Sequence, residues 1–438
     1  MMRVENYVDG RWVDPKGERF ESRNPMTGEP LASAPVSDAR AVDQAVEAAR
    51  RAFDQGDWRW RKGSERAAPL NALADRMAAR ESELAELIAR EMGKPVRINR
   101  AREVEGAIDK LRFFAGAARM LEGRVTASTA AIFEIAHEAK LFPPGVINLV
   151  HGPGEPTGEA LVGHPKVDKI SFTGSTATGI RIMERAAARL AKVSLECGGK
   201  FPAVVFADAD LERCLDAVTY GAFMYAGQSC TACARLVVED RVHDAVVGGV
   251  VERTKKLPIG DPLDPKVLVG PMASRKQRDK VVSYIRLGLG EGAKAVAGGD
   301  PGERNDLFLQ PTILVGAPDD GRIAREEVFG PVLTVHRFKD EQQALAIANG
   351  TPYGLGGSIW SQDISRALRL ARRLDCADVW VNTHYVRHAE TSFGGRHLSG
   401  LGRELGMAGV EEYVSWKRLC IDTRAAFHLR TWFEQGGA

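Results

Sequence analysis

Short apolar runs alternate with longer amphipathic stretches along most of the chain. An apolar run followed by an amphipathic stretch is typical of a strand followed by a helix, and repeated alternation of the two favours an α/β fold. The pattern is clearest from residue 145 onward. We expect strands there over residues 146–150, 167–172, 193–196, 203–206, 236–239, 312–315, 332–338, 358–360 and 378–382.

The N-terminal part carries helical periodicity after an opening hairpin. Tyr7–Val13 has Asp9-Gly10 at its centre, a pair that favours a tight turn between two short strands. Asp38 is a typical N-cap for a helix that we expect to run to about Phe53. Further helices are expected from Ser64, from Ser82 to Gly93, and over about Arg100–Leu121.

Composition and charge narrow the class of function. The 438 residues are 44% hydrophobic, which excludes intrinsic disorder and allows roughly two or three domains. A net charge of +2 predicts neither nucleic acid nor an anionic membrane as a partner, and no apolar run reaches the roughly 20 residues of a membrane span. Six cysteines are too few for a disulfide scaffold, so we expect a cytoplasmic protein, and no metal site is predicted.

Cys230 is the first candidate for catalysis. It lies in Gly-Gln-Ser-Cys-Thr-Ala-Cys at residues 227–233, where small neighbours let a substrate reach the thiol. A thiolate there is a nucleophile, and its own backbone N–H is placed to face the oxyanion that the attack creates. The alternative is a buried structural cysteine, the usual fate of a free cysteine.

Glu196 is the second candidate. It is flanked by a leucine and a cysteine and is followed by Gly198-Gly199, which permit close approach of backbone or ligand. Partial desolvation of this carboxyl group would raise its pKa toward the range of a general base. The alternative is a salt-bridged glutamate beside Lys200.

A third candidate is the turn at residues 172–179, Phe-Thr-Gly-Ser-Thr-Ala-Thr-Gly. A strand ends there, the chain turns at Gly174, and a helix begins. The free N–H groups of a helix N-terminus at the carboxyl end of a strand suit a pyrophosphate group. An ordinary βα turn is the alternative, because the glycine spacing is not the complete G-x-G-x-x-G fingerprint.

Further motifs follow downstream. Glu326–Pro331 places a carboxylate two residues before an aromatic ring, ahead of a strand. Asn382 follows an apolar strand, and the loop Phe393–Glu404 is dense in glycine. Each motif by itself is compatible with plain turn chemistry.

In order and spacing, these motifs resemble those of the NAD(P)-dependent aldehyde dehydrogenase superfamily, from about Tyr7 to Lys417. The resemblance implies a Rossmann-like nucleotide-binding domain over residues 1–198 and an α/β catalytic domain over residues 199–405. It also implies a small β oligomerisation element over residues 406–438. The matching stretches are residues 7–13, 24–29, 93–95, 172–179, 195–200, 227–235, 326–331 and 393–404.

The resemblance also implies a role for each motif. Cys230 matches the nucleophile, and Glu196 matches the general base that activates the deacylating water. Glu327 matches the carboxylate that holds the nicotinamide ribose, and Phe329 matches the aromatic residue near the nicotinamide. The turn under the cofactor pyrophosphate is matched by Gly174, Ser175, Thr176 and Gly179. The implied reaction oxidises an aldehyde to a carboxylic acid with NAD or NADP, through a thiohemiacetal and a thioester on Cys230.

One family segment has no counterpart in the sequence. The family's Pro-Trp-Asn-Phe-Pro and Lys-Pro-Ser/Ala-Glu motifs would fall near residues 124–129, and neither occurs in the chain. The first motif supplies a side-chain oxyanion donor, whose loss typically costs about 10²–10³ in rate. The sequence therefore predicts an incomplete nucleotide-binding domain and impaired turnover. The alternatives are a cofactor-free thiol esterase and a catalytically inactive aldehyde dehydrogenase-like subunit.

Few residues point to the substrate. Phe223 and Tyr225 precede Cys230 and are candidates for lining an access tunnel. The loop His384–His388 contains Arg387 and is both basic and aromatic, which indicates a polar or anionic aldehyde. A solvated loop with surface histidines is the alternative.

Members of the family assemble as dimers or tetramers, so the resemblance implies a homo-oligomer. Tyr413, Val414 and Trp416 suit β structure. We therefore expect Glu411–Cys420 to supply the interface strand.

Overall fold

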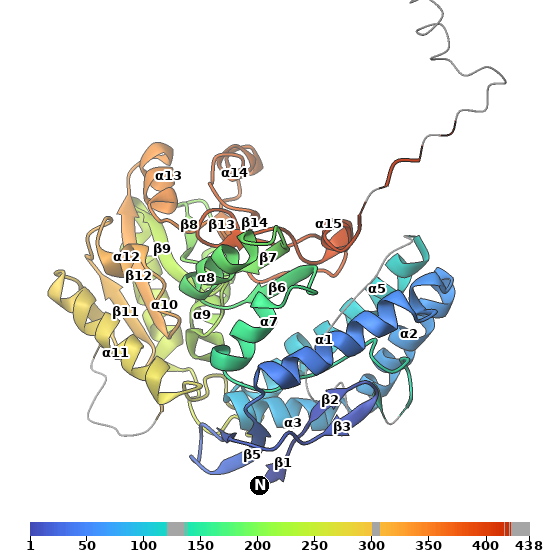
Figure 1. Cartoon of the computed structure of the whole chain (residues 1–438). Coiled ribbons are helices and arrows are strands. Elements are labelled where there is room, and N and C mark those ends of the chain that lie inside the picture. Colours follow the sequence, from blue (N-terminus) through green and yellow to red (C-terminus); the bar gives the residue numbers. More distant parts are fainter. Residues whose placement is uncertain (121–135, 138, 300–306, 416, 420, 422–438) are drawn as a thin grey trace, which may run out of the picture.

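The computed structural model describes residues 1–120, 136–137, 139–299, 307–415, 417–419 and 421. The junction at residues 124–129, where the family segment is expected to be missing, lies outside these residues. The described part of the chain forms four sheets. Strands β1, β5 and β4 make one and β2 and β3 another near the N-terminus, and the later strands make a larger and a smaller sheet with helices packed on both (Figure 1). The α/β class predicted from the alternating pattern is confirmed.

The larger sheet has seven strands within the described ranges, in the order β10-β11-β12-β9-β8-β13-β14. Every neighbouring pair is parallel except β10 and β11. Its strands are β8 Phe201–Val205, β9 Cys233–Glu239, β10 Lys294–Ala297, β11 Thr312–Val315, β12 Val332–Phe338, β13 Gly356–Trp360 and β14 Asp378–Val381. The six strands predicted from residue 203 onward all occur, and β10 is added at the edge.

Helices cover both faces of this sheet. Ala203 and Leu236 pack into one core cluster, and their chain neighbours Val204 and Val237 pack into another on the opposite face. Because both faces are buried, the central strands are mostly apolar and do not alternate between apolar and polar residues. The covering helices are α9 Leu211–Phe223, α10 His243–Lys255 and α11 Arg275–Gly290 on one face, and α13 Glu341–Asn349 and α14 Ile364–Ala371 on the other.

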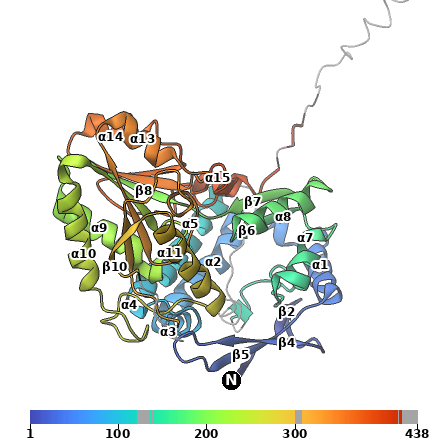
Figure 2. The same ribbon diagram turned by 90° about the vertical axis from the view of Figure 1, so that its left-hand side faces the viewer.

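The smaller sheet has three strands in the described part, in the order β15-β7-β6. β6 (Lys169–Thr173) and β7 (Lys192–Glu196) are parallel, and β15 (Gly400–Leu401) returns from far along the chain to pair antiparallel with β7. The helices α7 (Glu159–Gly163) and α8 (Thr176–Ala187) accompany it. Figure 2 shows this sheet on the side of the molecule opposite the seven-stranded sheet.

The N-terminal part forms the hairpin and helices that its sequence predicts. Asp9 and Gly10 both have positive φ at the turn between β2 and β3, and Asp38 caps α1 by accepting a hydrogen bond from Ala41 N. The strands are β1 Met2–Arg3, β2 Asn6–Val8, β3 Arg11–Val13, β4 Arg19–Arg23 and β5 Pro30–Pro35. The helices are α1 Ala39–Asp54, α2 Gly63–Ala79, α3 Glu81–Met92, α4 Val96–Asn99, a π-helical turn Arg100–Val104 and α5 Glu105–Met120.

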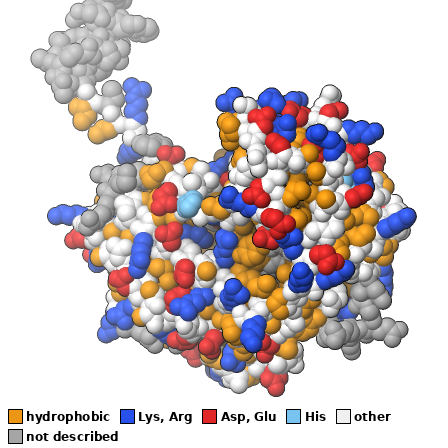
Figure 3. Space-filling model, turned by 180° about the vertical axis from the view of Figure 1, so that it is seen from behind, with side chains coloured by type: hydrophobic (Ala, Val, Ile, Leu, Met, Phe, Trp, Pro, Cys, Tyr) orange, Lys and Arg blue, Asp and Glu red, His pale blue; other side chains and the backbone are white. Residues whose placement is uncertain are grey.

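Short elements complete the described chain. α12 (Arg322–Arg325) precedes β12, and α15 (Gly406–Glu411) follows β15. The 3₁₀ turns are Trp58–Trp60, Met224–Gly227 and Asp240–Val242, and a further π-helical turn spans Gly154–Gly158. Seen from behind, hydrophobic side chains gather in a hollow bordered by Lys and Arg side chains (Figure 3). No helix in the described ranges has both the length and the apolar character needed to cross a bilayer.

The strand expected over residues 146–150 does not form. Residues 144–146 make a turn, and Leu149 makes only an isolated antiparallel bridge with Tyr7. The Asn148 side chain accepts a hydrogen bond from Asp9 N and donates one to Gly145 O. The polar groups of this segment are therefore satisfied by the N-terminal hairpin, and the segment does not enter the smaller sheet.

The interface strand expected over Glu411–Cys420 is also not formed in the described part of that segment. α15 ends at Glu411 and is followed by turns in which Tyr413 N donates to Val410 O and Val414 N to Glu411 O. Trp416 and Cys420 lie outside the described residues. A β-prone sequence becomes a strand only when a neighbouring strand accepts its hydrogen bonds, and this segment has no such neighbour in the described chain.

Candidate active site

Cys230 lies on the loop that enters the amino end of β9. The preceding turn holds Tyr225 and Ala226 at φ values of 55° and 53°, in the left-handed region that side chains other than glycine rarely occupy. Such strain persists only where the surrounding structure enforces it, and it clusters at functional sites. The Ser229 hydroxyl is hydrogen-bonded to the Tyr385 hydroxyl at 2.8 Å, which ties this loop to the segment after β14.

Glu196 is the last residue of β7, and the chain enters β8 of the other sheet at Phe201. The short linker between the two strands therefore crosses from one sheet to the other. A Cβ atom added at Gly199 would lie 2.6 Å from the Cys230 carbonyl oxygen, and one at Gly198 would lie 2.2 Å from Glu327 Oε2. Only glycine permits these approaches, so the double glycine is what brings the linker against both Cys230 and Glu327.

The Glu196 carboxyl group is buried without a partner. Its residue is 4% exposed, and neither of its oxygens has a hydrogen-bond partner among the described residues. Burial, and secondarily the charge of Glu404, raises the pKa of Glu196 to about 8, while Arg387 and Arg403 oppose the shift. A carboxyl group with this pKa is suited to exchange a proton with water near neutral pH.

The alternative of an ion pair between Glu196 and Lys200 is wrong. Lys200 is 2% exposed, and its Nζ likewise has no hydrogen-bond partner within the described chain. Burial and the neighbouring Arg235 lower the pKa of Lys200 to about 7, against the opposing charge of Glu327. Lys200 therefore does not pair with Glu196, and the neighbouring charges that act on it are those of Arg235, Glu327 and Glu326.

The Cys230 thiol lies between charges of both signs. Burial raises its pKa, the charge and hydrogen bonding of Arg387 lower it, and the carboxylates of Glu327 and Glu196 raise it further. Cys230 keeps some accessible surface, whereas Cys197, Cys214 and Cys233 are buried. The interpretation of Cys230 as a fully buried structural cysteine is therefore not supported by its exposure.

The helix α8 presents its N-terminus at the carboxyl end of β6. The Ser175 side chain caps the helix by accepting a hydrogen bond from Thr178 N at 3.3 Å, and Gly174 N donates to Glu196 O at 3.0 Å. A Cβ atom at Gly179 would lie 2.8 Å from Cys197 Sγ, so glycine lets α8 pack closely on β7. Exposed N–H groups at a capped helix start are the donor set that a pyrophosphate group needs.

Glu327 and Phe329 lie on the loop before β12 and line a pocket together with Gly199 and Ser229. Glu327 Oε1 accepts a hydrogen bond from Gly199 N at 2.9 Å, and burial raises the pKa of its carboxyl group. Phe329 has a φ of 57°. Three motifs that are distant in the sequence therefore meet at the amino ends of β8, β9 and β12. They are residues 196–199, 227–230 and 327–329.

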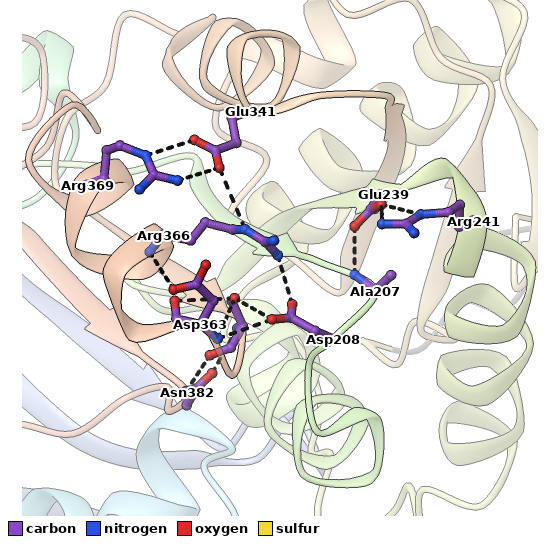
Figure 4. Close-up of polar contacts among 10 residues, drawn as sticks. Ala207, Asp208, Glu239, Arg241, Glu341, Asp363, Arg366, Arg369 and Asn382 are labelled. Carbon is purple, nitrogen blue, oxygen red and sulfur yellow. Dashed lines mark hydrogen bonds and ion pairs between the residues drawn. The ribbon is translucent and has the colours of Figure 1, made fainter.

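Asn382 serves a structural purpose. Its side-chain amide accepts a hydrogen bond from Ser361 N at 3.0 Å and donates one to Ser361 O at 2.8 Å. Asp208 accepts hydrogen bonds from Ser361 Oγ and from Arg366 Nη1, each at 3.0 Å (Figure 4). The network joins the carboxyl ends of β13 and β14 and anchors the start of the loop that carries Arg387.

Two of the residues considered for substrate access belong to the core. Phe223 is 1% exposed and packs in the main core cluster, so its assignment to an access tunnel is wrong. His384 is 7% exposed, its ring lies 5.0 Å from that of Phe201, and burial lowers its pKa to about 4. Tyr225 is also buried, whereas Arg387 and His388 are exposed.

The sequence placed Tyr385 only in the basic, aromatic loop considered for the substrate, and assigned no role to Glu404. Tyr385 holds the nucleophile loop through Ser229, and Glu404 acts electrostatically on Glu196. Glu404 lies in the glycine-dense loop that the sequence singled out. The sequence did not indicate that this loop lies beside Glu196, because that contact depends on the pairing of β15 with β7.

A sequence model of the aldehyde dehydrogenase family matches residues 12–131 and 124–419, so the chain belongs to this family. A betaine aldehyde dehydrogenase of Bacillus subtilis is 35% identical over 480 aligned positions, which cover 96% of this chain and 98% of the relative. Bovine aldehyde dehydrogenase 1A1 is 36% identical over 471 positions, which cover 95% of this chain and 94% of that protein.

Solved structures agree with this membership. A betaine aldehyde dehydrogenase of Staphylococcus aureus, crystallised in complex with NAD+, superposes with a TM-score of 0.93 at 30% identity, covering 98% of this chain and 99% of that one. An NAD-dependent aldehyde dehydrogenase of Sinorhizobium meliloti gives a TM-score of 0.93 at 34% identity, with coverage of 97% and 96%. The expected aldehyde dehydrogenase-like fold is therefore confirmed.

Proposed function

We propose that this protein oxidises an aldehyde to the corresponding carboxylic acid, with NAD or NADP as the hydride acceptor and Cys230 as the nucleophile. The observation that carries the proposal is the convergence of Cys230, Glu196 and Glu327 at the junction of the two sheets. Membership of the aldehyde dehydrogenase family and the NAD+ bound in a similar structure support it.

The Cys230 thiolate adds to the carbonyl carbon, so a C–S bond forms and the π electrons move to oxygen. The backbone N–H of Cys230 faces that oxygen. A bound nicotinamide cofactor would supply the hydride acceptor. Loss of the hydride from the tetrahedral carbon leaves a thioester on Cys230. Glu196 removes a proton from water as the water attacks the thioester. The C–S bond then breaks, releasing the acid and the thiolate.

The cofactor-binding residues fit a dinucleotide at one end of the site. Ser175 and Thr176 offer the start of α8 to a pyrophosphate group, while Gly174, whose N–H donates to Glu196 O, forms the turn that leads into the helix. Gly179 lets the helix lie close to β7. Glu327, whose Oε1 accepts a hydrogen bond from Gly199 N, would hold the nicotinamide ribose, and Phe329 lines the same pocket.

The missing family segment remains part of the proposal. The family model matches in two pieces that meet at residues 124–131, and the alignment with the Bacillus relative is longer than this chain. The described chain contains neither motif expected there and forms only three strands in the smaller sheet. We expect weaker cofactor binding and slower turnover than in a complete member, since a side-chain oxyanion donor is lost.

Calorimetric titration of the purified protein with NAD+ and NADP+, followed by an aldehyde panel with Cys230→Ala as the blank, tests the proposal. Saturable binding and Cys230-dependent acid formation support it. A folded protein that binds neither nucleotide overturns it, and a Cys230-dependent ester hydrolysis in that case identifies a thiol esterase. Absence of both activities identifies a catalytically inactive family member.

We also propose a cytoplasmic homo-oligomer, either a dimer or a tetramer, that uses the segment after α15. Leu419 and Ile421 are 77% and 70% exposed in the single chain, and burial of such side chains favours association. Light scattering coupled to size exclusion tests the assembly, and a monomer at micromolar concentration contradicts it.

A further inference from the structure

Arg387 lies beside the proposed nucleophile. Its guanidinium Nη2 donates a hydrogen bond to Thr231 Oγ1 at 3.3 Å, and Thr231 directly follows Cys230 in the chain. The guanidinium also stacks over the ring of Phe393, 3.8 Å from the ring centre, which restricts its movement. A cation is thus held next to the position where the aldehyde carbon bonds to sulfur.

Arg387 differs in its contacts from Arg403, the other arginine whose charge acts on Glu196. The Arg403 guanidinium donates to the carbonyl oxygens of Gly395 and Gly402. In the described chain, the side-chain acceptors of Arg387 are the Thr231 hydroxyl and the Cys230 thiol, neither of them a carboxylate. An exposed guanidinium with most of its donors unused is well suited to bind a carboxylate in a two-point geometry.

Charged groups around Arg387 are of both signs. Lys110 on α5 is close enough for Arg387 to disfavour its protonated form, and Arg102 donates a hydrogen bond to Tyr385 O at 2.7 Å. The carboxyl groups that act on the Cys230 thiol are Glu327 and Glu196, and the phenol of Tyr385 also faces it. Burial raises the pKa of Glu196 to about 8, so this group carries little negative charge at neutral pH where a second anion would approach. Burial also raises the pKa of Glu327.

We propose that the substrate is an aldehyde bearing a carboxylate one to three carbons from its carbonyl group, and that Arg387 binds this carboxylate. The inference rests on the proposed aldehyde oxidation. The short spacing follows from geometry, because the guanidinium contacts the residue adjacent to the nucleophile. A longer chain would carry its carboxylate past Arg387.

Alkylation of Cys230 tests this without any cofactor. Iodoacetate and iodoacetamide transfer nearly the same group to the thiolate with loss of iodide, but only iodoacetate carries a carboxylate. We expect Arg387→Gln to slow iodoacetate about tenfold more than iodoacetamide, the effect of one lost charge-assisted hydrogen bond. Arg387→Lys should retain part of the preference, and Arg396→Gln, which removes a surface arginine paired with Asp375, should leave it unchanged.

Peptide mass spectrometry at fixed pH measures the two rates at Cys230, with Cys230→Ala correcting for other cysteines. An unchanged ratio of the two rates in Arg387→Gln overturns the proposal. Equal slowing of both reagents also overturns it, because Arg387 would then act on the thiolate and not on the substrate.

Turnover of 4-oxobutanoate against butanal provides the second arm. We expect the preference in kcat/KM for 4-oxobutanoate to fall about tenfold in Arg387→Gln. If the unaltered protein oxidises neither aldehyde but retains the iodoacetate preference, the dehydrogenase function fails and the anion-binding role of Arg387 stands. If it oxidises butanal and 4-oxobutanoate equally well, the substrate proposal fails and the dehydrogenase function stands.

Discussion

The seven-stranded sheet and the smaller sheet that carries Glu196 differ in how completely they are built. The seven-stranded sheet is covered by helices on both faces and carries the loops of Cys230 and Glu327 at the amino ends of its strands. The smaller sheet has three strands in the described chain, one of them only two residues long, and carries Glu196 and the turn at Gly174. Cys230 therefore lies next to the sheet that helices cover on both faces, and the turn at Gly174 lies next to the smaller sheet. Reactivity of the thiol and binding of the cofactor are expected to be separable.

The largest expected effect is that of Cys230→Ala. Removal of the nucleophile should lower aldehyde oxidation by about 10³-fold or more, while nucleotide binding changes little because the cofactor turn lies on the other sheet. Steady-state kinetics and calorimetry measure the two effects. Residual turnover within tenfold of the unaltered protein would remove Cys230 from the mechanism.

Glu196→Gln tests the residue that ends the smaller sheet. We expect deacylation to slow by about 10²-fold or more, since the general base is lost. In the unaltered protein the rate should rise with pH up to about 8, because the base is active only when deprotonated and burial raises its pKa to about 8. A pH profile of kcat shows both effects, and an identical alkaline rise in the Gln variant would contradict the assignment.

The same carboxyl group affects stability. Its pKa is raised from 4.5 to about 8, so the folded protein holds this proton where the unfolded chain has released it. The contribution to stability is present below about pH 4.5 and is lost as the pH rises to about 8. Urea unfolding at pH 5 and pH 8.5 measures this contribution. The free energy of unfolding should fall less between the two pH values in Glu196→Gln than in the unaltered protein. An equal fall in both proteins would argue against a buried, unpartnered carboxyl group.

Gly199→Ala breaks the contact between the two sheets. The added methyl group would lie 2.6 Å from the Cys230 carbonyl oxygen, so the nucleophile loop must shift. We expect a loss of about 1–3 kcal/mol in stability and a fall of about tenfold or more in turnover. Gly248→Ala on α10, where nothing lies within 4 Å of an added Cβ atom, is the matched control. Equal effects of the two substitutions would mean that the close approach is unimportant.

The substitution with the smallest expected effect tests most directly whether the two sheets act independently. In Gly179→Ala the new methyl group would meet Cys197 Sγ at 2.8 Å and push α8 from β7. Nucleotide affinity should fall by several-fold up to about tenfold, while alkylation of Cys230 by iodoacetamide stays the same. Gly158→Ala, which meets nothing within 4 Å, provides the control. A parallel loss of thiol reactivity would show that the two sheets do not act independently.

Local sequence signals predicted most elements well. Asp38 and Ser175 each cap a helix at a position where the sequence predicts a helix start, because a side-chain oxygen satisfies a free N–H within the same turn. The segment at residues 146–150 is apolar enough for a strand but bonds to the N-terminal hairpin, a choice that depends on residues far away in the chain. Neither the hydrophobic pattern nor turn chemistry contains that information.

The sequence alone determined the α/β class, the helix starts and the candidate residues Cys230, Glu196, Glu327 and Phe329, since these depend on periodicity, local hydrogen bonding and motif order. The tertiary structure decided which of these residues meet and what surrounds them. It left Glu196 without a partner, placed Phe223 and His384 in the core and brought Arg387 to Thr231. The reason is physical: a side chain's pKa and reach are set by the groups packed around it, and packing here joins residues more than a hundred positions apart in the chain.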